Sequence, residues 1–384
     1  MIFNKHIRSQ INEATQRLMS GGAAAVIKKA LNGIPAGMGK PSSSPKIPEF
    51  VTDLLASLGL PSLNDVGTMN QYFWDQEQSV PPVPETEVEE ISGGLFLTKS
   101  YTNQAGTRNY KVYIPSSYNG EAIPVIVMLH GCTQNPDDFA KGTRMNAIAE
   151  EMKCLVVYPA QSQSANSTKC WNWFKAINQQ RDRGEPSIIA GITDQVISDY
   201  KLDRKRVYVA GLSSGGAMAI IMGRTYPDLY AAVGIHSGLP FGCAQDLPSA
   251  YAAMRGAQPK VRRKFQTSDA DSQRRSLPII VFHGDSDSTV HFSNAEQLIN
   301  QNVSSAQARA DRKDPHIIVK KGKVPNGHAF TQTLHQDENG RTVAEHWVIH
   351  GAGHAWAGGS KRGSYTDAQG PDASKEMMRF FYSN

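Results

Sequence analysis

The chain has 384 residues, 40% hydrophobic content and a formal net charge of +5 at pH 7. This length and composition are typical of an ordinary globular protein with one large domain and an appendage. The lysines and arginines are dispersed rather than clustered, which argues against nucleic-acid binding. No apolar run approaches the ~20 residues that a membrane-spanning helix requires, so a transmembrane protein is not expected.

The first 90 residues differ in pattern from the rest. Between 8 and 31, apolar residues recur at roughly helical spacing, which predicts an amphipathic helical hairpin. The hairpin either packs on its own domain or docks to a surface or partner. From 33 to 90 the chain is rich in Pro, Ser and Gly, as a linker would be. We therefore expect 1–90 to be a helical segment with a linker, and 91–384 to be the main domain.

From residue 91 onward, short β-rich runs alternate with helical patterns. Apolar strands separated by helices predict a mainly parallel sheet with helices on both faces. The expected strands are 111–115, 123–130, 154–159, 207–211, 231–236, 279–283 and 345–350, and the expected helices are 187–200, 214–226, 294–300 and 372–381. The polar, basic stretch 239–276 interrupts this alternation, and it is either a lid-like excursion or a solvated loop.

The pentapeptide Gly211-Leu212-Ser213-Ser214-Gly215 has the pattern G-x-S-x-G, and it lies between an apolar strand and a helical run. A tight strand-to-helix turn needs glycines beside the serine and raises the serine near the helix N-terminus. Ser213 is therefore the candidate nucleophile. Ser214 follows it and is expected to offer its backbone N–H to a developing oxyanion.

A serine hydroxyl needs a base to remove its proton, and the base needs a carboxylate to orient it. Asp287 follows the strand 279–283, and His354 follows the last strand on a glycine-containing loop. Asp285 and His350 compete for these two roles. The order Ser213, Asp287, His354 along the chain is the one expected of α/β-hydrolases, so we predict that fold and that triad.

The second oxyanion donor is expected in the loop after an early strand, where the backbone N–H of Cys132 is the candidate. The four cysteines are too few for a disulfide scaffold, and Cys154 lies in an apolar run typical of buried thiols. A single bridge, for example between Cys132 and Cys170, is an open alternative. The histidines and cysteines lack metal-ligand spacing, so neither a metal nor a cofactor is expected.

Aromatic residues cluster in Cys170-Trp171-Asn172-Trp173-Phe174, and Trp356 follows His354 closely. Such residues either pack in the core or present an apolar wall to an acyl group or a polymer. Trp171, Trp173 and Trp356 are therefore candidate substrate-binding residues, with core packing as the alternative.

Several motifs together resemble the polyhydroxybutyrate depolymerase family of esterases, which is related to feruloyl and acetylxylan esterases of the same fold. The resemblance covers roughly 94 to the C-terminus and rests on Leu129–Gln134, Cys170–Phe174, Gly211–Gly216, His283–Asp287, Gly353–Trp356 and Gly370–Asp372. It implies a serine esterase that hydrolyses poly(3-hydroxybutyrate) or its oligomers, or acyl groups on plant polysaccharides. Without a visible polymer-binding domain, soluble oligomers or amorphous granules are the expected substrates rather than crystalline polymer.

Two rival functions are a noncatalytic protein that associates with granules through the N-terminal helices, and a peptidase of the same fold. An intact triad argues against the first, and the shortness of the N-terminal segment argues against the second. The N-terminus lacks the pattern of a signal peptide, which predicts a cytoplasmic location, whereas many members of the resembled family are secreted.

Overall fold

The computed structural model describes residues 93–257, 277–308 and 316–384, and for 305–308 the backbone alone. The chain divides into two units, Met1–Val88 and Glu89–Asn384, and all described residues belong to the second. The predicted helical segment and linker, 1–90, lie outside the described residues. None of the helices that are described is long and apolar enough to cross a membrane.

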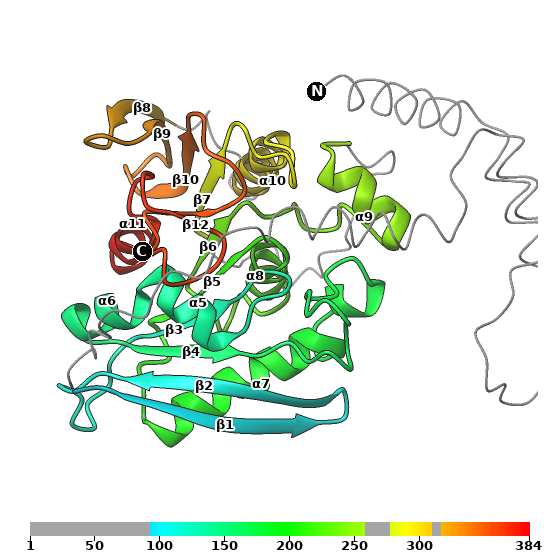
Figure 1. Cartoon of the computed structure of the whole chain (residues 1–384), viewed down its shortest axis with the longest axis vertical. Coiled ribbons are helices and arrows are strands. Elements are labelled where there is room, and N and C mark those ends of the chain that lie inside the picture. Colours follow the sequence, from blue (N-terminus) through cyan, green and yellow to red (C-terminus); the bar gives the residue numbers. More distant parts are fainter. Residues whose placement is uncertain (1–92, 258–276, 309–315) are drawn as a thin grey trace, which may run out of the picture. The chain divides into compact units, whose positions relative to one another are not determined.

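In the described part of the chain, ten strands form one sheet in the order β1-β2-β4-β3-β5-β6-β7-β10-β9-β8. Figure 1 shows β1 and β2 at one edge and β8 and β9 at the other. The six strands from β4 to β10 in this order run parallel, and the four strands outside them pair antiparallel. The strands are β1 (Leu95–Asn103), β2 (Gly106–Ile114), β3 (Val125–Leu129), β4 (Leu155–Pro159), β5 (Val207–Leu212), β6 (Ala232–His236), β7 (Ile279–Gly284), β8 (His316–Lys323), β9 (Ala329–Gln336) and β10 (Thr342–Ile349).

Alternate side chains of the central strands enter two separate hydrophobic cores, because successive residues of a strand point to opposite faces. Val125 and Val207 belong to one core, whereas Ile126 and Tyr208 belong to the other. The first core includes residues of α7 (Gly184–Asp199), α8 (Ser214–Thr225), α9 (Leu247–Met254) and α10 (Ser293–Ala308). The second includes residues of α5 (Pro136–Thr143), α6 (Met145–Met152) and α11 (Ala373–Tyr382). Helices therefore cover both faces, as predicted, and the fold is that of an α/β-hydrolase.

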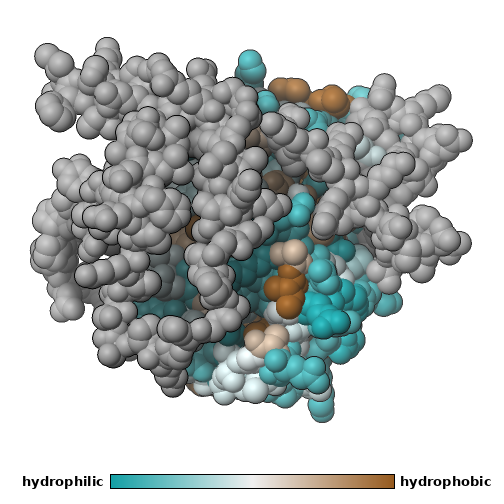
Figure 2. Space-filling model, turned by 90° about the vertical axis from the view of Figure 1, so that its right-hand side faces the viewer, coloured by the Kyte–Doolittle hydropathy of each residue, from teal (hydrophilic) through white to brown (hydrophobic). Residues whose placement is uncertain are grey.

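The structure adds elements that the sequence patterns did not indicate. These are β1, β8 and β9, the helices α5, α6 and α9, a 3-10 helix (Ala176–Gln179), and the short strands β11 (Trp356–Ala357) and β12 (Thr366–Asp367). Within the predicted excursion 239–276, α9 begins at a capping box formed by Asp246 and Ser249, and 258–276 lie outside the described residues. On the face drawn in Figure 2, the described surface is mainly hydrophilic, with small hydrophobic patches.

Candidate active site

Ser213 lies in the turn between β5 and α8, with φ 56° and ψ −119°. A non-glycine residue at positive φ is strained by about 1–3 kcal/mol, and such strain persists only where neighbours hold it. The Ser213 N–H donates to the backbone O of His236 at 2.9 Å, and the Ser213 O accepts from the Ala217 N–H at 2.9 Å. These bonds hold the predicted nucleophile at the carboxyl end of the central strand.

Gly211 and Gly215 make this turn sterically possible. A Cβ on Gly215 would overlap the backbone O of Leu129, and one on Gly211 would overlap the backbone of Gly215. The turn 211–215, called the elbow from here on, therefore packs directly against the end of β3. Ser214 is the first residue of α8, where backbone N–H groups lack partners within the helix and the helix dipole favours negative charge.

Asp287 lies in the turn after β7 and is 6% exposed. In the sheet, one strand, β6, separates β7 from β5. Its Oδ1 accepts from the backbone N–H groups of Thr289 at 2.9 Å and Val290 at 2.8 Å. Its Oδ2 lies 2.7 Å from Nδ1 of His354 and 3.3 Å from Nε2 of His283. Burial alone would raise the pKa of the Asp287 carboxyl, but the hydrogen bonds from the two histidines outweigh it and hold that pKa well below its ordinary value.

His354 follows β10, the neighbour of β7 in the sheet, and its side chain is 10% exposed. Because the ionised Asp287 accepts the Nδ1 proton, the neutral His354 ring keeps Nε2 unprotonated, which is the tautomer a general base needs. The strands β5, β7 and β10 run parallel, so all three predicted triad residues lie at the carboxyl ends of the strands, on the same side of the sheet.

The two competing residues, Asp285 and His350, pair with each other. Oδ2 of Asp285 lies 2.8 Å from Nδ1 of His350, and its Oδ1 accepts from the Gly351 N–H at 2.7 Å. Burial raises the pKa of the Asp285 carboxyl, but the hydrogen bond from Gly351 and the contacts with His350 and Ser286 together outweigh burial and hold that pKa below its ordinary value. Nε2 of His350 bonds to Thr331 at 2.9 Å, so this pair ties the turn after β10 to β9.

The loop after β3 brings Cys132 beside the elbow, with its Sγ 3.4 Å from Oγ of Ser214. The structure joins Cys132 to Cys170, the pairing that the sequence left open. The two cysteines are 38 residues apart in the sequence. In the chain-entropy model, closing a loop of this length stabilises the folded protein by roughly 4 kcal/mol. Among the described residues no acceptor is found for the Cys132 N–H, so this group is free to donate a hydrogen bond to another molecule.

His130 precedes this loop and is fully buried. Its Nε2 accepts from the Gln161 N–H at 3.1 Å, its backbone O accepts from Trp171 Nε1 at 3.2 Å, and burial lowers its pKa to about 4. Gln134, the last residue of the motif Leu129–Gln134, accepts from the Gly131 N–H through its side-chain oxygen at 2.9 Å. Both residues therefore shape the backbone on which Cys132 lies.

The three candidate substrate-binding tryptophans are buried. Trp171 is 0%, Trp173 6% and Trp356 1% exposed, with the first two in one core and the third in the other. Trp356 donates from Nε1 to Ser374, and its ring stacks against His236. This burial favours the core-packing alternative, and we do not propose these residues as substrate contacts.

No group of three or more His, Cys, Asp or Glu residues that could hold a metal is found in 93–257, 277–308 and 316–384. His236 is a buried histidine whose backbone O accepts from the Ser213 N–H at 2.9 Å. Its Nε2 accepts from the Ala357 N–H at 3.0 Å, and burial lowers its pKa to about 3. His236 is therefore neutral and supports the backbone behind Ser213.

Comparison with known proteins finds depolymerases and esterases among the relatives of this chain. The chain is 30% identical over 257 residues to poly(3-hydroxyalkanoate) depolymerase C of Paucimonas lemoignei, covering 66% of this chain and 59% of the relative. It is 28% identical over 290 residues to poly(3-hydroxybutyrate) depolymerase of Ralstonia pickettii, covering 70% and 56%. It is 32% identical over 154 residues to a probable acetylxylan esterase A of Aspergillus fumigatus, covering 40% of each. The chain thus spans less than two thirds of the length of these relatives.

The solved structure of an acetyl xylan esterase from Aspergillus awamori superposes with a TM-score of 0.56 at 18% identity, covering 76% of this chain and 100% of that one, which supports the shared fold. The family model described as esterase PHB depolymerase matches residues 108–309, more than half of the 384 residues. The match includes the elbow, the loop of Cys132 and Asp287. The chain belongs to the polyhydroxybutyrate depolymerase family of esterases.

Proposed function

We propose that the protein is a serine esterase that hydrolyses carboxylic esters through an acyl-enzyme on Ser213. The observation that carries the proposal is the 2.7 Å contact between Asp287 and His354, at the sheet edge where the strained elbow presents Ser213. In this arrangement Ser213 Oγ attacks the ester carbonyl while Nε2 of His354 takes its proton. The backbone N–H groups of Cys132 and Ser214 bind the tetrahedral oxyanion.

His354 then gives its proton to the departing alkoxide oxygen, which leaves the acyl group on Ser213. Water attacks this acyl group, His354 takes the proton of the water, and collapse of the second tetrahedral intermediate returns that proton to Ser213 Oγ. Asp287 stays ionised throughout and stabilises the imidazolium form of His354. The nucleophile, the base, the orienting carboxylate and the oxyanion donors all belong to the chain, and water is the second substrate.

For the substrate we propose poly(3-hydroxybutyrate) or its oligomers. The support is the family match and the two bacterial depolymerases, which align over 66% and 70% of this chain. Acetylated or feruloylated polysaccharide is the second candidate, favoured by the 32% identity to an acetylxylan esterase and the 30% identity to feruloyl esterase B of Neurospora crassa, each over 40% of this chain.

The test is the release of 3-hydroxybutyrate from amorphous polymer and oligomers, run beside release of acetate and ferulate from polysaccharide esters, with Ser213→Ala as the blank. Hydroxybutyrate release that depends on Ser213 supports the depolymerase. Release of acetate or ferulate alone moves the protein to the carbohydrate esterases with the same triad. A protein that only binds granules, through 1–90, would release none of the three.

A further inference from the structure

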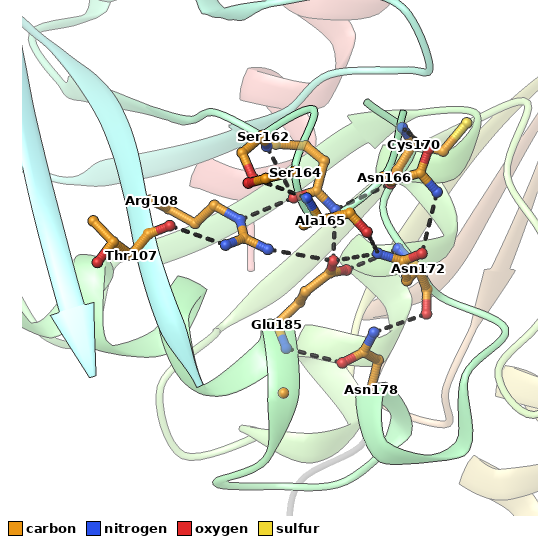
Figure 3. Close-up of polar contacts among 12 residues, drawn as sticks. Thr107, Arg108, Ser162, Ser164, Ala165, Asn166, Cys170, Asn172, Asn178 and Glu185 are labelled. Carbon is orange, nitrogen blue, oxygen red and sulfur yellow. Dashed lines mark hydrogen bonds and ion pairs between the residues drawn. The ribbon is translucent and has the colours of Figure 1, made fainter. Parts of the chain in front are cut away.

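The buried carboxylate of Glu185 accepts hydrogen bonds from residues at both ends of one loop. Glu185 lies in the first turn of α7 and is 5% exposed. Its Oε2 accepts from the Asn172 N–H at 2.8 Å, and its Oε1 accepts from Asn172 Nδ2 at 2.7 Å and from Gln161 Nε2 (Figure 3). One anion therefore organises the backbone on both sides of the loop 162–171.

Arg108, 8% exposed on β2, supplies the opposite charge. Its Nη2 lies 3.6 Å from Oε1 of Glu185, and its Nε donates to Gln161 Oε1 at 2.9 Å (Figure 3). Gln161 is thereby held from both ends, because its own amide nitrogen donates to Glu185. A buried charge is costly unless it is paired and hydrogen-bonded, and here the two opposite charges face each other while both Glu185 oxygens accept hydrogen bonds.

The loop organised by Glu185 holds the candidate oxyanion loop from several directions. Gln161 donates from Nε2 to the backbone O of Cys170 at 3.0 Å and from its backbone N–H to the His130 ring. Cys170 is joined to Cys132 by the disulfide. The Thr133 N–H donates to the Thr168 O at 2.7 Å, so His130, Cys132 and Thr133 are each tied to a residue within 161–170.

We propose that Glu185 and Arg108 are positioning residues for catalysis, which hold the backbone N–H of Cys132 where the oxyanion forms. The inference rests on the proposed esterase function and names the groups that prepare its transition-state contact. An oxyanion donor acts mainly when charge develops on the substrate oxygen, so its displacement lowers kcat more than it changes KM.

The test compares Glu185→Gln with Glu345→Gln in the full chain. Glu185→Gln removes the negative charge and puts an amide NH2, itself a donor, next to the donor groups of Gln161 and Asn172. Glu345 is a matched control, since it is 0% exposed, faces Arg379 and accepts from Gln332 and Trp347 at 2.7 Å, but lies on β10 away from the Cys132 loop. Both variants are expected to lower the melting temperature.

The two variants should differ in catalysis on a soluble ester such as p-nitrophenyl butyrate. For Glu185→Gln we expect kcat to fall about tenfold or more with KM within about twofold, as for a displaced catalytic group. The inhibition constant of an alkyl boronic acid, which forms a tetrahedral adduct on the serine, should rise by a similar factor. For Glu345→Gln both quantities should stay within about twofold of wild type.

Arg108→Lys is the second variant, which keeps the charge but cannot reproduce the planar fork of the guanidinium. It should lower kcat and boronate affinity together, by less than Glu185→Gln does. If Glu185→Gln folds and matches the control in kcat and boronate affinity, or if it does not fold and Arg108→Lys retains both, the positioning role is overturned. A wild-type protein that neither turns over esters nor reacts with a fluorophosphonate refutes the esterase function itself.

Discussion

Oδ2 of Asp287 lies 2.7 Å from Nδ1 of His354, while the neighbouring Asp285 lies 2.8 Å from Nδ1 of His350. Two Asp–His pairs thus stand at the ends of the same two strands, β7 and β10. They differ in burial, because Asp287 and His354 side chains are 0% and 10% exposed, whereas those of Asp285 and His350 are 35% and 44% exposed. Only the buried pair has the shielding from water that strengthens a charge-stabilised base.

The first prediction separates these pairs. Asp287→Asn should lower kcat by about 10⁴, because an asparagine oxygen no longer stabilises the imidazolium and its amide favours the wrong tautomer of His354. Asp285→Asn is the matched control and should keep kcat within a few-fold. Steady-state hydrolysis of p-nitrophenyl butyrate measures both. A large loss in Asp285→Asn with Asp287→Asn active would reverse the assignment.

A second prediction concerns the glycines of the site. Gly215→Ala should lower the free energy of unfolding by about 2 kcal/mol or more and abolish ester turnover, because its Cβ would overlap the Leu129 O and displace the elbow. Gly353→Ala should be close to wild type in both respects, since nothing lies within 4 Å of a Cβ there. Urea unfolding and ester kinetics test the pair, and a well-folded, active Gly215→Ala would refute the steric account.

The sequence motifs located the three triad candidates but not the residues that support the Cys132 loop. Ser213, Asp287 and His354 could be located because each follows a recognisable apolar strand, and the parallel sheet brings strand ends together. Their catalytic roles stay predictions. The support from Glu185 and Arg108 could not be predicted, because neither residue belongs to a recognised motif and only the fold buries both side chains.

Two of the missed strands share a physical cause. β1 and β8 lie at the edges of the sheet and expose most of their side chains, so each has only a short apolar run, Leu95–Leu97 and Ile317–Val319, beside polar residues. The tryptophans, by contrast, were recognised in the sequence, but their role could not be predicted. An aromatic cluster predicts burial and ligand contact equally, and only the packing of Trp171 and Trp356 into the cores distinguishes the two.

A third prediction concerns stability in acid. Burial, together with nearby His283 and His335, lowers the pKa of His346 to about 4, and its Nε2 has no hydrogen-bond partner among the described residues. The pKa of a histidine in an unfolded chain is about 6.5. Between about pH 6.5 and 4, His346 is therefore protonated in the unfolded chain but not in the folded protein. As the pH is lowered through this window, this group alone decreases the free energy of unfolding by about 1.4 kcal/mol per pH unit.

His346→Phe removes this group and its unpaired nitrogen. We expect the variant to be within about 1 kcal/mol of wild type at pH 7.5 and to lose less stability than wild type on going to pH 5. Urea unfolding at the two pH values measures the difference. Equal losses in the two proteins would mean that His346 is protonated in the folded state as readily as in the unfolded chain.

The most direct test of the account is the site of covalent labelling by a fluorophosphonate, located by mass spectrometry of the intact protein and its peptides. The account predicts one adduct per chain, on Ser213, with loss of ester turnover in proportion to labelling and no adduct in Ser213→Ala. An adduct on another residue, or a folded Ser213→Ala variant that still hydrolyses esters at the wild-type rate, would contradict it.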